Sequence, residues 1–245
     1  MTWMRFSHGF RLDPLAEGPA EAVVVVPHVA SAAVLIPVAN RWATAVPTTA
    51  FIALDGMEQH GPSSGCVPSQ TPCDPEANVE TNVLDREARH LEQILEHQLR
   101  ALRLDASRLV LVGFGHGGTL ALHMSLRQGK ICAGVLAYAA KLMRPLPRTI
   151  TVAHKVRLIE CGENGHVRHT SLRDDVALLT ARGIDARGVV LAGAALSDAA
   201  IRHGGAYLVE LVATAQRGDR YHVERTTLSS PSGKRARARE AGRQP

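Results

Sequence analysis

The sequence is poor in aromatic side chains, in cysteine and in long apolar runs. Aromatic residues make up 4% of the 245 residues, and four of the residues are cysteine. No apolar run reaches the roughly 18 residues that a membrane-spanning helix needs. Residues 1–8 lack the charged and then apolar layout of a secretory signal. These absences argue against a membrane-spanning or secreted protein and favour a cytoplasmic one.

The cysteines agree with a reducing compartment. Cys132 and Cys161 lie in apolar, strand-like runs, where a free thiol behaves as a small hydrophobic side chain. Cys66 and Cys73 share one loop, and their pairing is left open because nothing else indicates an oxidising environment. Cysteine usage therefore supports the expectation of a cytoplasmic location.

The net charge of +5 belongs to one end of the chain. From Arg217 onward, eight Lys and Arg residues stand against three Asp and Glu residues, so the remaining body is electrically balanced. The segment that begins at Ser229 is rich in Ser, Pro, Gly and Arg, a composition typical of disordered chain ends. We expect one folded domain over residues 1–216 and a basic, disordered tail over residues 217–245, with no specific nucleic-acid partner.

Apolar runs alternate with stretches of helical periodicity along the body of the chain. The longest such stretch opens at Pro75 and carries apolar residues three or four positions apart, which predicts an amphipathic helix. They are Leu84, Ala88, Leu91, Leu95, Leu99 and Leu102. Strands separated by single helices indicate a doubly wound α/β domain, with a parallel sheet covered on both faces. The predicted strands span residues 23–26, 48–54, 109–112, 131–138, 155–161 and 188–191. Further helices are predicted at residues 33–45, 170–182 and 198–215, and another follows the strand at 109–112 and ends at about residue 128.

One corner of the chain carries the most informative pattern. The apolar strand at 109–112 leads through glycines into a predicted helix, the layout on which α/β-hydrolases carry G-x-S-x-G. The central position is Gly115, which has no side chain and cannot act as a nucleophile. The letters Gly113-x-Gly115-x-x-Gly118 also match a dinucleotide-binding pattern. The corner leaves three interpretations open: an esterase, a nucleotide-binding protein, or a hydrolase fold that has lost its chemistry.

The nucleotide interpretation meets two obstacles. The dinucleotide pattern belongs to the first βαβ unit of its domain, whereas this corner follows two predicted strands and a long helix. It also needs an acidic residue about 20 residues further on to bind the ribose. Residues 135–141 contain no acidic side chain. Nucleotide binding therefore stays the weaker alternative, and we expect no cofactor.

Four segments together carry the patterns of one enzyme family. Residues 113–118 look like its G-F-S-Q-G-G elbow, and residues 24–28 resemble its strand that ends in L-L-H-G. Residues 51–56 resemble the strand before its P-D-G turn, and residues 156–164 resemble the strand and H-G-x-x-D turn that present an acid. Through the order and spacing of these segments along the chain, residues 20–213 resemble the small phospholipase/carboxylesterase-like serine esterases of the α/β-hydrolase superfamily. The resemblance implies a small, lidless α/β-hydrolase fold, with a mostly parallel sheet and helices on both faces.

The positions that match the family's catalytic residues carry other side chains. The resemblance places the serine nucleophile at Gly115 and the triad acid at Asn164, whose amide cannot carry the charge that stabilises an imidazolium. The catalytic histidine would follow the last strand, where the loop reads Ala194-Ala195-Leu196-Ser197. The resemblance also assigns vestigial oxyanion and elbow positions to His28, Val29, Gly113, His116 and Gly117.

The joint loss of nucleophile, acid and base predicts a family member without triad chemistry, because serine attack needs an oriented base. We expect a catalytically inactive protein that has a ligand-binding, regulatory or scaffolding role, with a small molecule in the vestigial cleft and homodimerisation left open. The alternative is an active carboxylic-ester hydrolase that uses displaced groups, and Cys161 is the candidate thiol nucleophile.

The end of the strand at 155–161 and the loop after it hold residue types that bind zinc. The weak metal candidates are Cys161, Glu163, His166 and His169. Since no second dense group of such residues occurs in the sequence, we expect no metal site.

Overall fold

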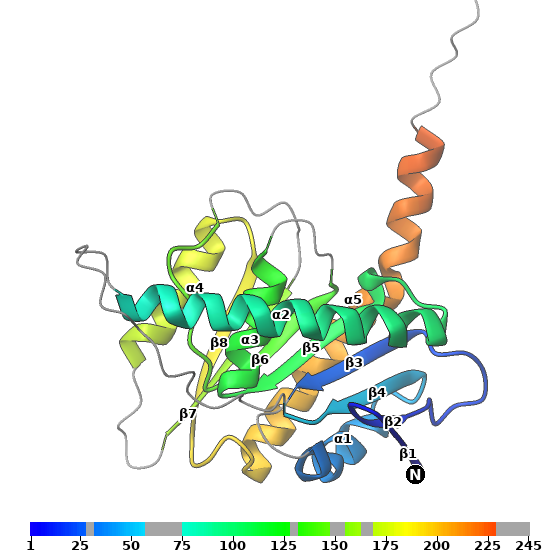
Figure 1. The fold of residues 1–245 in the computed structure, drawn as a ribbon. Helices are drawn as coiled ribbons and strands as arrows, with labels where there is room; N and C mark the ends of the chain where they lie inside the picture. Colours follow the sequence, from blue (N-terminus) through cyan, green and yellow to red (C-terminus); the bar gives the residue numbers. More distant parts are fainter. Residues whose placement is uncertain (28–31, 57–74, 128–131, 148–154, 163–168, 229–245) are drawn as a thin grey trace, which may run out of the picture.

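The structure is a computed structural model, and it describes residues 1–27, 32–56, 75–127, 132–147, 155–162 and 169–228. Within these residues, eight strands form a single sheet (Figure 1). The strands are β1 (Trp3–Phe6), β2 (Gly9–Leu12), β3 (Ala22–Pro27), β4 (Thr49–Leu54), β5 (Leu109–Phe114), β6 (Gly134–Tyr138), β7 (Lys155–Gly162) and β8 (Asp185–Ala192). Their order is β1-β2-β4-β3-β5-β6-β7-β8. Strand β2 is antiparallel to both its neighbours, and every pair from β4 across to β8 is parallel.

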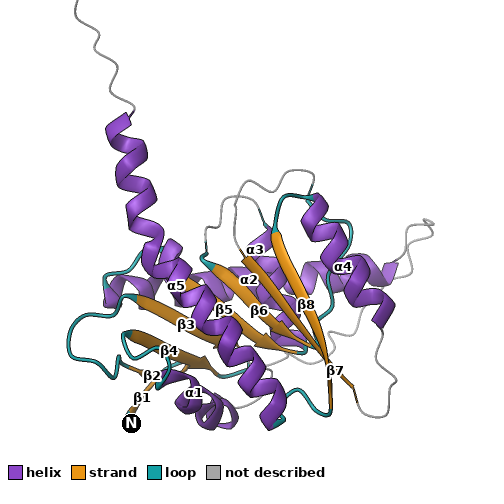
Figure 2. Cartoon of the chain, turned by 180° about the vertical axis from the view of Figure 1, so that it is seen from behind, coloured by secondary structure: helices purple, strands orange, loops and turns teal. Residues whose placement is uncertain are grey.

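Helices cover both faces of the sheet, as the sequence predicts. Helices α2, α3 and α4 lie on one face (Figure 1), and α1 and α5 lie on the other (Figure 2). Their bounds are α1 (Ile36–Ala43), α2 (Pro75–Leu102), α3 (His116–Leu126), α4 (His169–Ala181) and α5 (Asp198–Leu228), with short 3-10 turns at Ala32–Leu35 and Ala106–Arg108. In the described part of the chain, no helix combines the length and apolar character that a membrane span requires.

Successive residues of the central strands enter different cores. Val23 and Val25 of β3 pack in the cluster that includes Leu120 of α3, whereas Val24 of β3 packs in the cluster that includes Leu208 of α5. Strand side chains alternate between the two faces, so a strand covered on both sides must be apolar throughout. The unbroken run of valines in β3 is therefore the sequence signature of its position in the middle of the sheet.

An aromatic stack lies on the α5 side of the sheet. The ring of Phe114, the last residue of β5, stacks on Tyr138 of β6 with centroids 4.4 Å apart. The indole of Trp42 in α1 lies parallel to both rings, at 6.4 and 6.5 Å. Its Nε1–H donates a hydrogen bond of 3.0 Å to the carbonyl of Ile201 in α5. The stack thereby joins α1 and α5 to the end of β5.

The N-terminal hairpin of β1 and β2 was not among the predicted strands. Each strand has four residues, and arginines interrupt the apolar pattern at Arg5 and Arg11. The hairpin adds to the sheet through β4, where Gly9 pairs with Leu54. A Cβ on Gly9 would lie 2.1 Å from the carbonyl oxygen of Ala53, so this pairing requires glycine. Short, charged strands of this kind depend on a distant partner and leave no strong local signal.

Some elements differ in extent from their predictions. Strand β8 begins at Asp185 instead of 188, and β6 begins at Gly134 instead of 131. Helix α5 continues past its predicted end at 215 to Leu228, and its last turns project from the body (Figure 1). Residues 217–228, which were predicted to belong to the disordered tail, are therefore helical. Residues 229–245 lie outside the described residues, so disorder of this last part of the tail stays a prediction.

Candidate active site at the carboxyl edge of the sheet

The glycine-rich corner adopts the backbone geometry of a nucleophile elbow. Strand β5 ends at Phe114, α3 begins at His116, and Gly115 forms the turn between them with φ 55° and ψ −118°. A residue with a side chain adopts this conformation only at a cost in free energy, whereas glycine reaches it readily. The structure therefore has the sharp strand-to-helix turn on which hydrolases expose a nucleophile.

Hydrogen bonds hold this turn from both sides. The N–H of Gly115 donates to the carbonyl of Tyr138 at the end of β6, over 2.8 Å, and its carbonyl accepts from the N–H of Thr119 at 3.0 Å. The hydroxyl oxygen of Thr119 in turn accepts from the N–H of Lys141 at 2.9 Å. The elbow is thus tied to the segment that follows β6.

Two glycines of the pattern allow the strand and the helix to cross closely. A Cβ on Gly113 would lie 2.3 Å from the carbonyl carbon of Gly117, and a Cβ on Gly118 would lie 3.0 Å from the carbonyl oxygen of Gly113. Neither position has room for a side chain. The packing of the elbow accounts for Gly113 and Gly118 without a dinucleotide.

Gly115 differs from Gly113 and Gly118 in the space around it. A Cβ built on it would have no described atom within 4 Å outside its chain neighbours, so a side chain at this position would enter open space. The turn, its hydrogen bonds and the room for a nucleophile are all present. The side chain that would use them is absent.

His116, directly after the turn, is engaged with helix α2. Its Nε2 lies 2.7 Å from Oε2 of Glu87, and 40% of the histidine side chain is exposed against 15% of the glutamate. A parallel contact follows along the two helices, where His123 Nε2 lies 2.7 Å from Asp85 Oδ1. The hydrogen bond from His123 is the main reason why the pKa of Asp85 lies below its usual value. Neither pair was predicted, because the partners are 29 and 38 residues apart in the sequence.

The ends of β7 and β8 meet at the same edge of the sheet. The N–H of Gly193, directly after β8, donates to the carbonyl of Gly162 at the end of β7, over 3.1 Å. In the loop that follows, the hydroxyl of Ser197 accepts from the N–H of Ala200 at 3.3 Å, and so engages the first turn of α5. The loop where the family carries its histidine therefore contributes a helix-capping residue.

Cys161 lies near the carboxyl end of β7 as a free, half-buried cysteine. Burial, and then the nearby charge of Glu160, raise the pKa of its thiol above the usual value. Nucleophilic cysteines need the thiolate, which a raised pKa disfavours. Cys132 is fully buried, and burial raises its pKa to about 12. Neither environment activates a thiol.

A carboxylate outside the predicted site anchors the segment that enters α1. Oδ1 of Asp55, just after β4, accepts a hydrogen bond of 2.9 Å from the N–H of Ala32. Its other oxygen lies 2.9 Å from Nη2 of Arg5, and its own N–H donates to the carbonyl of His8 at 2.9 Å. The turn at Asp55 was predicted from the sequence. Its contacts were not predicted, since all three partners lie far away in the sequence.

Several predicted site residues lie outside the described residues. They are His28, Val29, Cys66, Cys73, Glu163, Asn164 and His166. His169 is the first residue of α4. Among the residues that the structure describes, no group of three or more His, Cys, Asp or Glu side chains is arranged to hold a metal ion.

The mostly parallel eight-stranded sheet, its single reversed strand β2 and the elbow after β5 together define an α/β-hydrolase fold. Residues 16–160 match the phospholipase/carboxylesterase family, and because this match covers more than half of the chain, the protein belongs to that family. No curated protein matches the sequence.

Solved esterase structures share the fold. Esterase PE8 superposes with a TM-score of 0.69 at 22% identity, and the alignment covers 83% of this chain and 98% of that chain. The Bacillus cereus carboxylesterase gives a TM-score of 0.62 at 10% identity, with coverages of 82% and 92%. A carboxylesterase from Mesorhizobium loti gives 0.57 at 14% identity, with coverages of 77% and 88%. Identities this low establish the architecture alone, and the predicted α/β-hydrolase fold is confirmed.

Proposed function

We propose that this member of the phospholipase/carboxylesterase family does not perform triad chemistry and that its cleft binds a small molecule without turning it over. The observation that carries the proposal is Gly115, which holds the elbow position with an open space where the nucleophile would project. The family's fold and elbow remain, and the reactive hydroxyl is gone.

The residues at the positions that the resemblance gives to the base and the acid support the same proposal. Acyl transfer by serine needs an imidazole within hydrogen-bond reach and a third group that orients it. The loop from Ala194 to Ser197 has no histidine, and Asn164 stands at the family's acid position. The imidazole nearest to the elbow in sequence, that of His116, is engaged with Glu87 on α2.

The retained elbow favours a ligand-binding role over a purely structural one. Its sharp turn is held by the bonds to Tyr138 and Thr119, although no side chain needs to be presented there. Backbone N–H groups at the start of α3 remain suited to a carbonyl or carboxylate oxygen. We propose a small carboxylic acid or ester as the bound molecule.

Hydrolysis of short-chain p-nitrophenyl esters tests the proposal. The purified protein should release p-nitrophenol no faster than heat-denatured protein does. The Gly115→Ser variant should remain equally inactive, because a hydroxyl without an oriented base is a poor nucleophile. Turnover by the unmodified protein well above the denatured control would overturn the proposal.

The rival function is an active carboxylic-ester hydrolase that uses displaced groups. Fluorophosphonate labelling followed by mass spectrometry distinguishes the two. We expect no adduct; an adduct on a serine or on Cys161 would favour the rival. The nucleotide-binding alternative stays a prediction, and a rise in melting temperature with NAD+ would support it.

The proposal also keeps the expectations of a cytoplasmic location, of no cofactor and of no specific nucleic-acid partner. Homodimerisation remains open, and analytical ultracentrifugation decides it.

A further inference from the structure

Strand β8 forms one edge of the sheet, and its outer side has no partner strand among the described residues (Figure 2). It has eight residues and contains no proline, whereas β1 at the opposite edge has four residues. Natural proteins shorten, interrupt or cover the edges of their sheets, because a long open edge offers a row of unpaired N–H and C=O groups to another chain. The β8 edge is therefore better suited to strand pairing than the β1 edge.

The pairing of β8 with β7 identifies the backbone groups that face outward. The N–H of Gly193 donates to the carbonyl of Gly162, so the odd-numbered residues of β8 direct their N–H and C=O groups toward β7 and the even-numbered residues direct theirs away from it. No described residue accepts from the N–H of Gly188, Val190 or Ala192. Gly188 is exposed, and because it has no side chain, its exposed surface is backbone. The outward groups are thus within reach of a second strand.

The helices beside β8 leave this edge uncovered. Helix α4 lies directly over one face of the strand, where a Cβ on Gly188 would lie 2.9 Å from Cδ1 of Leu172. On the other face, α5 packs along β5, β6 and β7. Val189 and Leu191 of β8 border the core on this side and are half-exposed. The edge therefore combines unpaired backbone groups with apolar side chains that are only partly covered.

A second copy of β8 fits this edge in an antiparallel register. With a two-fold axis at Val190, Gly188 of each copy lies opposite Ala192 of the other copy. The outward N–H and C=O groups of these three residues then pair with one another across the axis. The same register places Val189 opposite Leu191 on the α5 side, so each half-exposed apolar side chain gains an apolar neighbour.

The charges of β8 also fit a partner of the same sequence. Its two charged residues, Asp185 and Arg187, lie near its amino end. In the two-fold register, Arg187 lies opposite Gly193 of the other copy, and Asp185 lies opposite Ala195. No like charges face each other across the shared ladder, where they would oppose pairing. The strand is thus complementary to itself in backbone groups, apolar side chains and charge.

We propose that the protein forms a two-fold homodimer in which the β8 strands of two copies pair antiparallel and join the two sheets. Backbone hydrogen bonds of Gly188, Val190 and Ala192 and the contact of Val189 with Leu191 hold the interface. The interface lies three strands away from β5, which leads to the elbow. It does not depend on the proposed loss of triad chemistry.

Sedimentation velocity and amide hydrogen exchange on the full-length protein test the proposal. A monomer–dimer equilibrium with a dissociation constant on the order of 10 µM is expected, since two single strands form a small interface. At a protein concentration about tenfold above that constant, about one fifth of the chains remain monomeric, so exchange at Gly188, Val190 and Ala192 should slow about fivefold. A protein that stays monomeric, or a dimer that leaves these N–H groups unprotected, would overturn the proposal. Protection that arises only with an unrelated extended peptide would assign the edge to a foreign strand and would equally contradict it.

The Val190→Pro variant removes an N–H that lies at the two-fold axis and faces away from β7. It should weaken the dimer at least about tenfold, because one hydrogen bond from each copy is lost. Val190→Ala is the matched control, since it shortens the same side chain and keeps the N–H. It should dimerise within about threefold of the unmodified protein. Equal dimerisation of the two variants, with circular dichroism showing both folded, would contradict the strand pairing.

A charge exchange tests the register and does not rely on proline. Val189→Glu and Leu191→Lys should each weaken the dimer about tenfold, because a charge then faces an apolar side chain of the other copy. The double variant places the two new charges opposite each other across the axis and should recover most of the lost affinity. A double variant that dimerises no better than the single variants would refute the two-fold register at Val190.

Discussion

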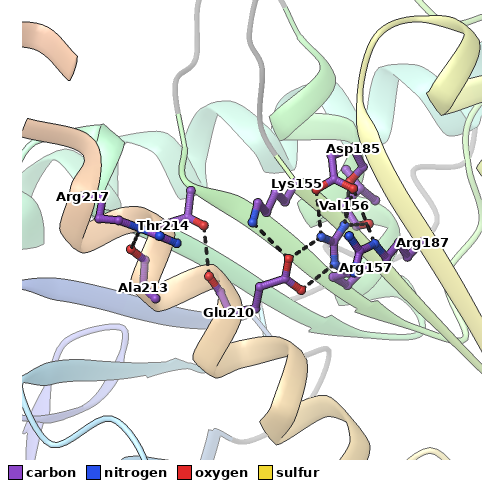
Figure 3. A network of polar contacts seen from close by, with 9 residues as sticks. All are labelled: Lys155, Val156, Arg157, Asp185, Arg187, Glu210, Ala213, Thr214 and Arg217. Atoms are coloured by element: carbon purple, nitrogen blue, oxygen red, sulfur yellow. Dashed lines mark hydrogen bonds and ion pairs between the residues drawn. The ribbon is translucent and has the colours of Figure 1, made fainter. Parts of the chain in front are cut away.

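The amino ends of β7 and β8 differ from the carboxyl end of β5 in the polar side chains that they carry. Near the amino ends of β7 and β8, the guanidinium of Arg157 is completely buried and is bonded to Asp185 of β8 and Glu210 of α5 (Figure 3). At the carboxyl end of β5, Gly115 presents an open position with no polar side chain at all. The amino ends of β7 and β8 carry a network of charge pairs, whereas the turn after β5 carries no side chain.

The network around Arg157 leaves few polar atoms unpaired. Its Nη2 lies 2.7 Å from Oε1 of Glu210 and 3.0 Å from Oδ2 of Asp185, and its Nε donates to Oε2 of Glu210 at 3.1 Å. Its Nη1 donates to the carbonyls of Val156 and Asp185. Lys155 adds a contact of 3.0 Å to Glu210. A buried cation is tolerated only when it is paired in this way.

The contrast shows that folding constrains the two ends differently. Removing a partner from the network would leave a buried charge, which a stable fold cannot easily accept. Glycine at position 115 suits a turn with positive φ. The turn therefore needs no reactive side chain for the fold to form.

The largest expected effect on stability is at the amino ends of β7 and β8, where the network around Arg157 lies. Arg157→Ala should lower the free energy of unfolding by about 3–5 kcal/mol, because it removes a fully buried side chain together with its hydrogen bonds to Asp185 and Glu210. Urea unfolding followed by circular dichroism measures the loss. The neighbouring Arg187 is 61% exposed, so Arg187→Ala should cost less than about 0.5 kcal/mol. Equal losses for the two variants would contradict the structural role of the network.

The second-largest effect on stability is expected for substitutions at the elbow. Gly113→Ala should cost about 2–3 kcal/mol, because its Cβ would meet the backbone of Gly117 at 2.3 Å and the strand or helix would have to move. Gly115→Ala should cost about 1–2 kcal/mol, from backbone strain alone. Thermal unfolding of both variants gives the comparison. A costlier change at Gly115 would mean that the space beside it is filled.

Acidification tests the charge pairs directly. The hydrogen bond from Arg157 is the main cause that lowers the pKa of Glu210 from 4.5 to about 2. Because the folded-state pKa is depressed, the contribution of Glu210 is fully present above pH 4.5 and is lost as the pH falls toward about 2. Urea unfolding across this range should show a weaker pH dependence for Glu210→Gln than for the unmodified protein. An identical dependence would contradict the pairing of Glu210.

The smallest effect is expected where the elbow contacts α2. His116→Gln should change the free energy of unfolding by less than about 1 kcal/mol, since its contact with Glu87 is partly exposed and solvent screens it. Chemical unfolding measures the change, and Glu87→Gln serves as the matched variant from the other side. A loss as large as that of Gly113→Ala would make this pair part of the elbow's framework.

Local signals explain what could be predicted from the sequence. The run of valines in β3 and the apolar residues of β5 identify strands covered on both faces. The glycines around Gly115 identify the elbow, because a sharp turn and a close crossing restrict the residue types that fit. Fold and elbow were predictable because each depends on residues close together in the chain.

Long-range pairings explain what could not be predicted. Arg157 interrupts an apolar strand and gives no hint that its partners are Asp185 and Glu210, from later elements. The contact of His116 with Glu87 joins the start of α3 to a face of α2 that looks like an ordinary charged surface. Such contacts depend on how distant elements approach each other, which composition and periodicity do not encode.

The aromatic stack behind the elbow gives the protein an optical reporter. The chain has two tryptophans, one in strand β1 and one in helix α1. Trp42 stacks near Phe114, next to the turn, whereas Trp3 in the N-terminal hairpin donates through its Nε1–H to Asn40 Oδ1 at 2.9 Å. In a Trp3→Phe background, the remaining indole emission would follow events at the elbow. The fluorescence of Trp42 can thus report on the elbow without any chromogenic reaction, and it offers a direct test of the proposed binding of a small molecule there.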